Sequence, residues 1–145
     1  MKKEVLVVKI SQDAKLPERA LAGDAGYDLF SNECTEIEPG KIKIVGTGIR
    51  IALPKGMEAQ IRPKSGLALN YGITVLNTPG TIDPNYRGEI KVILINLGEK
   101  KFKVEKGQKI AQIVFNRFAT PKLKETSALD KTERGQNGFG STGLR

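Results

Sequence analysis

Apolar and polar residues alternate along much of this chain, and turn-forming residues interrupt the alternation at roughly the 8–12-residue spacing of short strands. Met57, Ala59 and Ile61 show the period of two that places side chains on one face of a strand. The expected turns are Pro39-Gly40, Gly46 to Gly48, Pro54 to Gly56, Pro79-Gly80, Leu97-Gly98 and Lys106-Gly107. This pattern predicts an all-β fold, a jelly-roll-like sandwich or barrel.

Several expected strands are apolar on both faces, and only one segment favours a helix. Residues 92–95 and 110–115 carry apolar side chains on both faces, as strands do inside a sandwich or at a subunit contact. Ile42 and Ile44 are expected to point the same way as Ile49, Ile51 and Leu53. Residues 65–70 favour a short helix with Ser65 as its N-cap.

The chain has the length of a single domain, with a change of composition near its end. We expect residues 1–118 of the 145 to form the β domain. Residues 119–145 hold few large apolar side chains and many glycines, which predicts a flexible C-terminal arm. Residues 1–10 are expected to form a first strand rather than a signal peptide. Because no signal peptide is expected, we expect a cytoplasmic protein. No apolar run approaches the roughly 18 residues of a membrane span, so we expect no membrane partner.

The histidine and cysteine content limits the kinds of catalytic and metal site that the chain can form. The chain has no histidine and a single cysteine, Cys34. This excludes an intramolecular disulfide, a zinc site of cysteine and histidine, and every catalytic triad with a histidine base. The formal net charge of +8 suits an anionic partner, although lysines spread along a surface serve solubility as well.

The segment 80–90 combines turn formers with reactive side chains. It lies between two apolar runs, Tyr71 to Leu76 and Ile90 to Leu97, and is expected to form a hairpin connection. Asp83 and Tyr86 would lie at its tip, where a carboxylate can orient a water and an aromatic ring can stack on a planar ligand. An ordinary surface turn with an aspartate is the alternative.

Two further segments suit phosphate. Residues 62–68 place two cations and a hydroxyl at the expected helix start, and residues 134–143 combine glycines with an arginine, a serine and a threonine. The second segment lacks the ending of a P-loop, so it does not support a Walker-type ATPase. Together with Asp83 and two aromatic residues, these segments suit a nucleoside polyphosphate better than a duplex.

In these segments the chain resembles the homotrimeric dUTP diphosphatases, or dUTPases, which are all-β enzymes that split dUTP into dUMP and pyrophosphate. Five motifs of that family are matched in order, by residues 25–29, 63–67, 77–89, 107–112 and 134–143. They extend over nearly the whole chain.

The resemblance implies a role for each matching residue. Asp83 would be the catalytic base that activates the attacking water. Substrate would be bound by Lys64, Ser65, Gly66, Asn77, Gly80, Thr81, Ile82, Tyr86, Lys91, Gln112, Arg134, Phe139, Gly140, Ser141 and Thr142. Tyr86 would lie under the deoxyribose and exclude a 2′-hydroxyl, and Phe139 would stack on uracil.

The resemblance also implies a cofactor and an assembly. Mg²⁺ would be held by the triphosphate without a direct protein ligand, and Asp28 would act indirectly near its water shell. The enzyme would be a homotrimer with shared active sites and no nucleic-acid partner. Its reaction would limit uracil in DNA and supply dUMP for dTMP synthesis.

Two positions depart from the family pattern. Lys64 stands where the family usually has arginine, and a lysine cannot make the bidentate fork of a guanidinium. Asn85 stands where a second acid is frequent, which leaves Asp83 as the only carboxylate between Gly80 and Gly88.

Other functions are compatible with parts of the pattern. A dCTP deaminase, or a bifunctional relative on the same fold, is the nearest alternative, but it needs a glutamate at the pyrimidine ring. A regulatory protein that binds nucleotide without turnover is a second alternative. A basic nucleic-acid-binding β domain is a third, and it leaves the ordered motifs unexplained.

Overall fold

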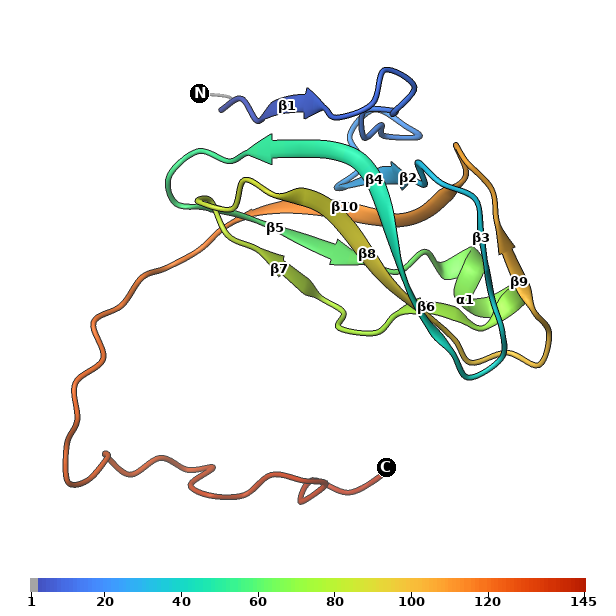
Figure 1. Cartoon of the computed structure of the whole chain (residues 1–145). Coiled ribbons are helices and arrows are strands. Elements are labelled where there is room, and N and C mark those ends of the chain that lie inside the picture. Colours follow the sequence, from blue (N-terminus) through green and yellow to red (C-terminus); the bar gives the residue numbers. More distant parts are fainter. Residues whose placement is uncertain (1–2) are drawn as a thin grey trace.

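The computed structural model describes residues 3–145, so Met1 and Lys2, which begin the expected first strand, lie outside the described residues. The described part of the chain contains ten strands and one short helix (Figure 1). In chain order these are β1 Leu6–Lys9, β2 Gly26–Phe30, β3 Thr35–Ile37, β4 Ile42–Ala52, β5 Met57–Arg62, α1 Ser65–Tyr71, β6 Ile73–Val75, β7 Gly80–Ile82, β8 Glu89–Asn96, β9 Phe102–Val104 and β10 Lys109–Arg117.

Two four-stranded antiparallel sheets hold the core between them. The first has the strand order β1-β4-β8-β6 and the second β2-β10-β5-β7, while β3 and β9 form a small third sheet. Within residues 3–145 the sheets do not close into a barrel, so the sandwich prediction is confirmed. The core contains side chains from both large sheets, among them Ile49, Val92 and Leu94 from the first and Ala59 and Ile113 from the second.

Strand β4 corrects two sequence predictions. Gly46 to Gly48 do not form a turn but continue the strand through a register shift against β8. Gly48 adopts a φ of +73°, and its N–H donates to the Glu89 carboxylate at 3.2 Å. The Asn32 N–H donates to the Gly46 carbonyl and the Ile10 N–H to the Gly48 carbonyl. Because these bonds and the Glu89 carboxylate satisfy the backbone here, the glycines form an irregularity within a strand instead of a chain reversal.

The same strand places its isoleucines on two faces. Ile42 and Ile44 are each 55% exposed, whereas Ile49 and Ile51 are buried, so the expectation that they share a face is wrong. Ile44 and Ile49 are five positions apart in the chain, and an odd spacing reverses the face of a strand. The outer face of this sheet consequently carries exposed isoleucines.

The connection between β6 and β8 is more complex than a hairpin. The two strands pair as expected, with Ile73 opposite Asn96, but Tyr71 belongs to helix α1 and not to a strand. Strand β7 lies within the connection and pairs with β5 of the other sheet. The segment 80–90 therefore crosses from one sheet to the other.

Helix α1 confirms the expected position but not the expected cap. Its N-cap residue is Lys64, which has an extended backbone and makes no side-chain capping hydrogen bond. Ser65 is instead the first helical residue, because the Ala68 N–H already donates to the Lys64 carbonyl at 3.0 Å.

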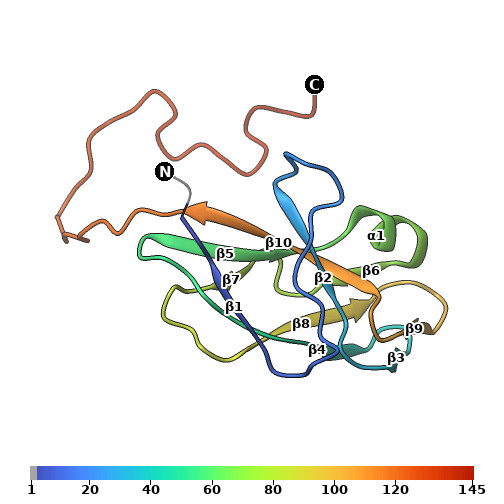
Figure 2. The ribbon, with the colours of Figure 1, turned by 90° about the horizontal axis from the view of Figure 1, so that it is seen from above.

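The C-terminal segment leaves the sandwich after β10. Residues 118–145, all within the described part of the chain, form neither helix nor strand. Both views show this segment standing away from the sheets (Figures 1 and 2). Phe139 is fully exposed, and Leu123 and Leu129 are almost fully exposed.

Candidate active site

Seven of the residues expected to bind or transform substrate line one cavity of about 270 Å³. They are Asn77, Gly80, Thr81, Ile82, Asp83, Tyr86 and Lys91. The cavity is flanked by β7 of one sheet and β8 of the other, so the crossing of the chain between sheets creates it. Glu89 also lines it and is a second carboxylate.

Asp83 stands on a closed β-turn. The Tyr86 N–H donates to the Asp83 carbonyl at 3.1 Å, and Pro84 occupies the position that favours such a turn. The Arg87 guanidinium donates to the carbonyls of Pro84 at 2.7 Å and Tyr86 at 3.0 Å. These bonds hold the exposed Asp83 carboxylate on a defined backbone beside the cavity.

The ring of Tyr86 lies over the residues that follow it in the chain, Gly88 and Glu89. Its hydroxyl donates to the Glu89 carbonyl at 3.0 Å, and its ring passes over Gly88 so closely that an added Cβ would collide with it. Gly80 is similarly confined, since an added Cβ would lie 3.1 Å from the Asn77 amide nitrogen. Gly80 thus lets the Asn77 amide approach the backbone, and Gly88 does the same for the Tyr86 ring.

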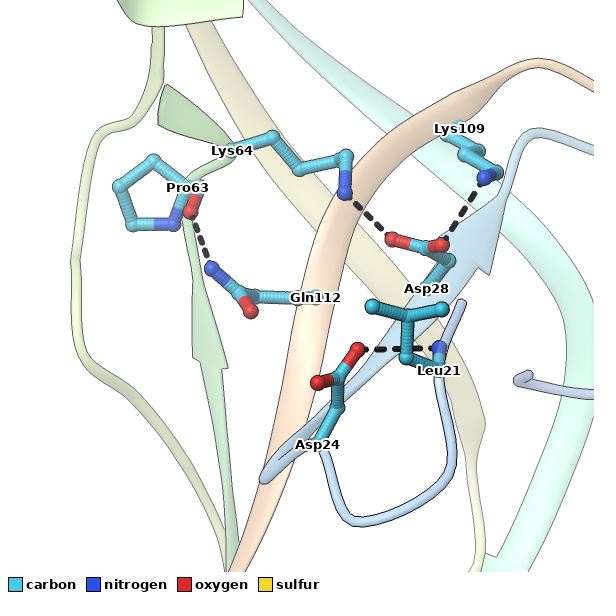
Figure 3. Close-up of polar contacts among 7 residues, drawn as sticks. All are labelled: Leu21, Asp24, Asp28, Pro63, Lys64, Lys109 and Gln112. Atoms are coloured by element: carbon cyan, nitrogen blue, oxygen red, sulfur yellow. Dashed lines mark hydrogen bonds and ion pairs between the residues drawn. The ribbon is translucent and has the colours of Figure 1, made fainter. Parts of the chain in front are cut away.

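A second group surrounds Asp28 on β2 (Figure 3). One oxygen of this buried carboxylate accepts a hydrogen bond from the Lys64 ammonium, and the other pairs with the Lys109 ammonium at 3.1 Å. Burial acts to raise the pKa of Asp28, but the two lysines outweigh it and hold the pKa below the usual carboxyl value.

Gln112 joins this group to the start of α1. Its amide donates to the Pro63 carbonyl at 2.9 Å, directly before Lys64 and Ser65 (Figure 3). Gly26 of β2 faces the Gln112 side chain, which occupies the space that a Cβ would need. The glycine therefore leaves room for the Gln112 side chain on β10, whose amide reaches the Pro63 carbonyl just beyond β5.

A third group lies in the C-terminal segment. Arg134, Ser141 and Thr142 border a small hollow together with Glu133 and Asn137. Arg134 donates through Nε to the Asn137 carbonyl at 2.9 Å. Phe139 and Gly140 lie in the same segment, both with positive φ, and both are exposed.

The structure of one chain keeps these three groups apart. Among residues 3–145, neither the Asp28 group nor the C-terminal group contributes a side chain to the cavity beside Asp83. Sequence reasoning did not assign Lys109, Arg87 or Gly88, although all three lie inside the matched motifs. Only the contacts of the folded chain reveal their roles.

No helix within residues 3–145 has the length and apolar character that a membrane crossing requires. Over the same residues, no three side chains of histidine, cysteine, aspartate or glutamate gather in a way that could hold a metal ion.

Comparisons with known proteins point to a single family. A dUTPase family profile matches residues 12–143. A deoxyuridine 5′-triphosphate nucleotidohydrolase of Clostridium novyi (strain NT) is 58% identical, over 97% of this chain and 99% of that protein. One of Thermoanaerobacter sp. (strain X514) is 53% identical, over 97% of this chain and 98% of that protein.

A solved structure agrees with the sequence comparisons. A variant of the Staphylococcus bacteriophage 80alpha dUTPase with dUpNHpp superimposes with a TM-score of 0.93. The two chains are 27% identical, and the alignment covers 99% of this chain and 100% of that chain.

Proposed function

The chain belongs to the dUTPase family and is a dUTP nucleotidohydrolase, and from this premise we propose how its residues divide the reaction. Water attacks the α-phosphorus of dUTP and releases dUMP and pyrophosphate, with Asp83 as the general base. The observation that carries this proposal is the fixed position of Asp83 on its turn beside the cavity. A positioned carboxylate of this kind can accept the proton of the attacking water.

The cavity beside Asp83 receives the nucleoside. Asn77 and the backbone of Gly80, Thr81 and Ile82 read the uracil edge, and Lys91 lines the same space. Tyr86 packs against the deoxyribose. Its ring is held through Gly88 and Glu89, which supports a rigid wall that leaves no room for a 2′-hydroxyl.

The Asp28 group and the C-terminal segment bind the triphosphate. Lys64, Ser65, Gly66 and Gln112 hold phosphates on the body of the enzyme. Arg134, Phe139, Gly140, Ser141 and Thr142 close over the substrate, and Phe139 stacks on uracil. The exposure of all five residues supports this role, because they are free to meet a ligand.

Mg²⁺ fits this arrangement as an ion that is bound by the triphosphate. Both oxygens of Asp28 are engaged by lysines, so this carboxylate suits an indirect contact through water better than direct ligation. When bound, Mg²⁺ neutralises phosphate charge. The residues of the chain orient the phosphates and the attacking water.

The enzyme works as a homotrimer with shared active sites. The separation of the three groups in one chain supports sites completed by neighbouring subunits. The outer face of the β4 sheet is apolar and exposed at Leu6, Val8, Ile42 and Ile44, which suits a subunit contact. Sedimentation analysis is expected to give a mass near three times 15.8 kDa.

The reaction keeps dUTP low, which limits uracil in DNA, and supplies dUMP for dTMP synthesis. We place it in the cytoplasm, where nucleoside triphosphates are made. A dCTP deaminase is not favoured, because the relatives are named nucleotidohydrolases. Pyrophosphate release from dUTP, dTTP, dCTP and UTP, assayed in parallel, tests the proposal. Release from dUTP alone is expected, and ammonia release from dCTP would contradict it.

A further inference from the structure

One buried carboxylate with two lysine partners is an unusual arrangement beside a phosphate site. Asp28 is 6% exposed, and its two oxygens are bound to different ammonium groups. Lys64 precedes helix α1, and Lys109 begins strand β10. The three residues thus join three elements, and Figure 3 shows the two lysines approaching the carboxylate from opposite sides.

The charges of this group do not balance. Two ammonium groups and one carboxylate leave one positive charge in excess, so one lysine is available to a second anion. Leaving a buried carboxylate without any partner is strongly unfavourable. With two lysines present, however, one can leave Asp28 while the other still neutralises it.

The chemistry of lysine makes such an exchange feasible. An ammonium group is a compact charge on a flexible stem, whereas a guanidinium is a planar fork that binds two acceptors in a fixed geometry. Lys64 stands at a position where the family usually has arginine, and its side chain is 28% exposed. It can therefore turn from Asp28 toward an incoming anion.

The surroundings indicate which lysine moves. Lys64 is adjacent in the chain to Ser65 and Gly66, the residues to which we assign phosphate binding, and Gln112 anchors the preceding Pro63 carbonyl. Lys109 lies on the opposite side of the carboxylate, in the strand that pairs with β2 itself. Lys64 is thus beside the segment to which we assign phosphate binding, and Lys109 is beside the carboxylate's own strand.

We propose that the two lysines have different tasks: Lys64 exchanges Asp28 for a phosphate of the incoming dUTP, and Lys109 stays on Asp28 as a positioning residue. This inference rests on the proposed function, because it takes the phosphates to lie beside Ser65 and Gly66. It predicts that the contribution of Lys109 to phosphate binding depends on the presence of Lys64.

A double-mutant cycle tests this dependence. The dissociation constant of dUpNHpp is measured for the wild type, Lys64→Gln, Lys109→Gln and the double variant. Each single variant is expected to bind roughly ten- to a hundredfold more weakly, as for the loss of one hydrogen bond to a charged group. The double variant is expected to bind about as weakly as Lys64→Gln alone, because no exchange remains for Lys109 to assist.

Matched variants separate this role from net charge and from folding. Lys109→Arg keeps the cation and is expected to bind dUpNHpp about as tightly as the wild type. Lys101→Gln makes the same chemical change at an exposed ion pair with Glu36 and is expected to have no effect. Affinity for deoxyuridine, which has no phosphate, is expected to stay unchanged in all variants.

A second measurement uses the wild-type enzyme. The ¹⁵N signal of the Lys64 side chain is expected to shift when dUpNHpp is added, while that of Lys109 changes little. Additive losses in the cycle, an unaffected Lys109→Gln, or a shift of the Lys109 signal alone would overturn the inference. Failure of the wild type to release pyrophosphate from dUTP would instead refute the proposed function.

Discussion

At the scale of single residues, Asp83 depends on the turn that carries it. Its backbone is fixed by the Tyr86 N–H and by Arg87, so a change of its side chain leaves the cavity intact. Asp83→Asn keeps the shape and removes the proton acceptor. We expect kcat to fall by about 10²–10⁴-fold, the usual cost of losing a general base, while dUpNHpp still binds.

Stopped-flow or steady-state pyrophosphate release measures this loss. Asp13→Asn is the control, because it removes an exposed carboxylate that pairs with Lys106 outside the candidate site. Near-normal turnover by Asp83→Asn would show that another group takes the proton.

Tyr86 is expected to select the sugar through its ring. Tyr86→Ala removes the ring and should lower the preference for dUTP over UTP, measured as the ratio of kcat/KM values. Tyr86→Phe keeps the ring and loses only the hydroxyl bond to the Glu89 carbonyl, so it should retain most of the preference. An unchanged ratio in Tyr86→Ala would place sugar selection elsewhere.

Asp28 links the site to the pH dependence of stability. Its pKa is lowered in the folded protein, so folding favours the ionised form. The stabilisation is present above the unfolded-state pKa of the carboxyl and is lost as pH falls through the lower folded value. The difference in unfolding free energy between the wild type and Asp28→Asn should therefore shrink in acid, as denaturant titrations at several pH values can measure. A difference that is independent of pH would contradict this assignment.

At the scale of elements, the C-terminal segment is the part of the molecule most open to change on binding. Beyond Arg117 it packs little against the sheets, and Phe139 is fully exposed. We expect this segment to order over bound nucleotide and to exclude bulk water. Truncation after Glu133 should strongly lower kcat but leave the melting temperature nearly unchanged, since the core lies within residues 14–114.

Hydrogen exchange tests the ordering directly. Amides of residues 134–145 should exchange quickly in the free enzyme and slowly with dUpNHpp and Mg²⁺. The amides of β8 provide the internal control, because this strand lies between β4 and β6. Equally fast exchange in both states would refute closure of the segment.

At the scale of the whole molecule, the separation of Asp83 from the C-terminal group predicts sites built from several chains. Asp83→Asn and the chain truncated after Glu133 should each be nearly inactive. When their subunits are mixed and exchanged, some mixed assemblies would combine an intact Asp83 with an intact C-terminal segment from a neighbour. We expect activity to recover in the mixture.

The control is a mixture in which exchange is demonstrated by native mass spectrometry. Recovery only after exchange supports shared sites. Absence of recovery despite exchange would place the base and its closing segment in the same chain.

Local pattern by itself determined the class of fold of this protein and predicted the residues of its candidate site. The period of two in strands such as β5 is set by backbone geometry, so it is visible in a few consecutive residues. The motif residues around Asp83 and Lys64 were likewise recognisable. Glycines are needed where a ligand comes close to the backbone, and charged side chains are needed where phosphate or water is bound, so both occur at fixed spacing. The family followed from their order along the chain.

Only the tertiary structure decided how distant segments meet. The glycines of β4 suit a turn or a strand irregularity equally well, and pairing with β8 selects the irregularity. Strand β7 joins the opposite sheet because β5 offers it an edge. Lys64 and Lys109 share Asp28 because three elements converge there. Each of these outcomes depends on contacts between residues far apart in sequence, which local periodicity cannot specify.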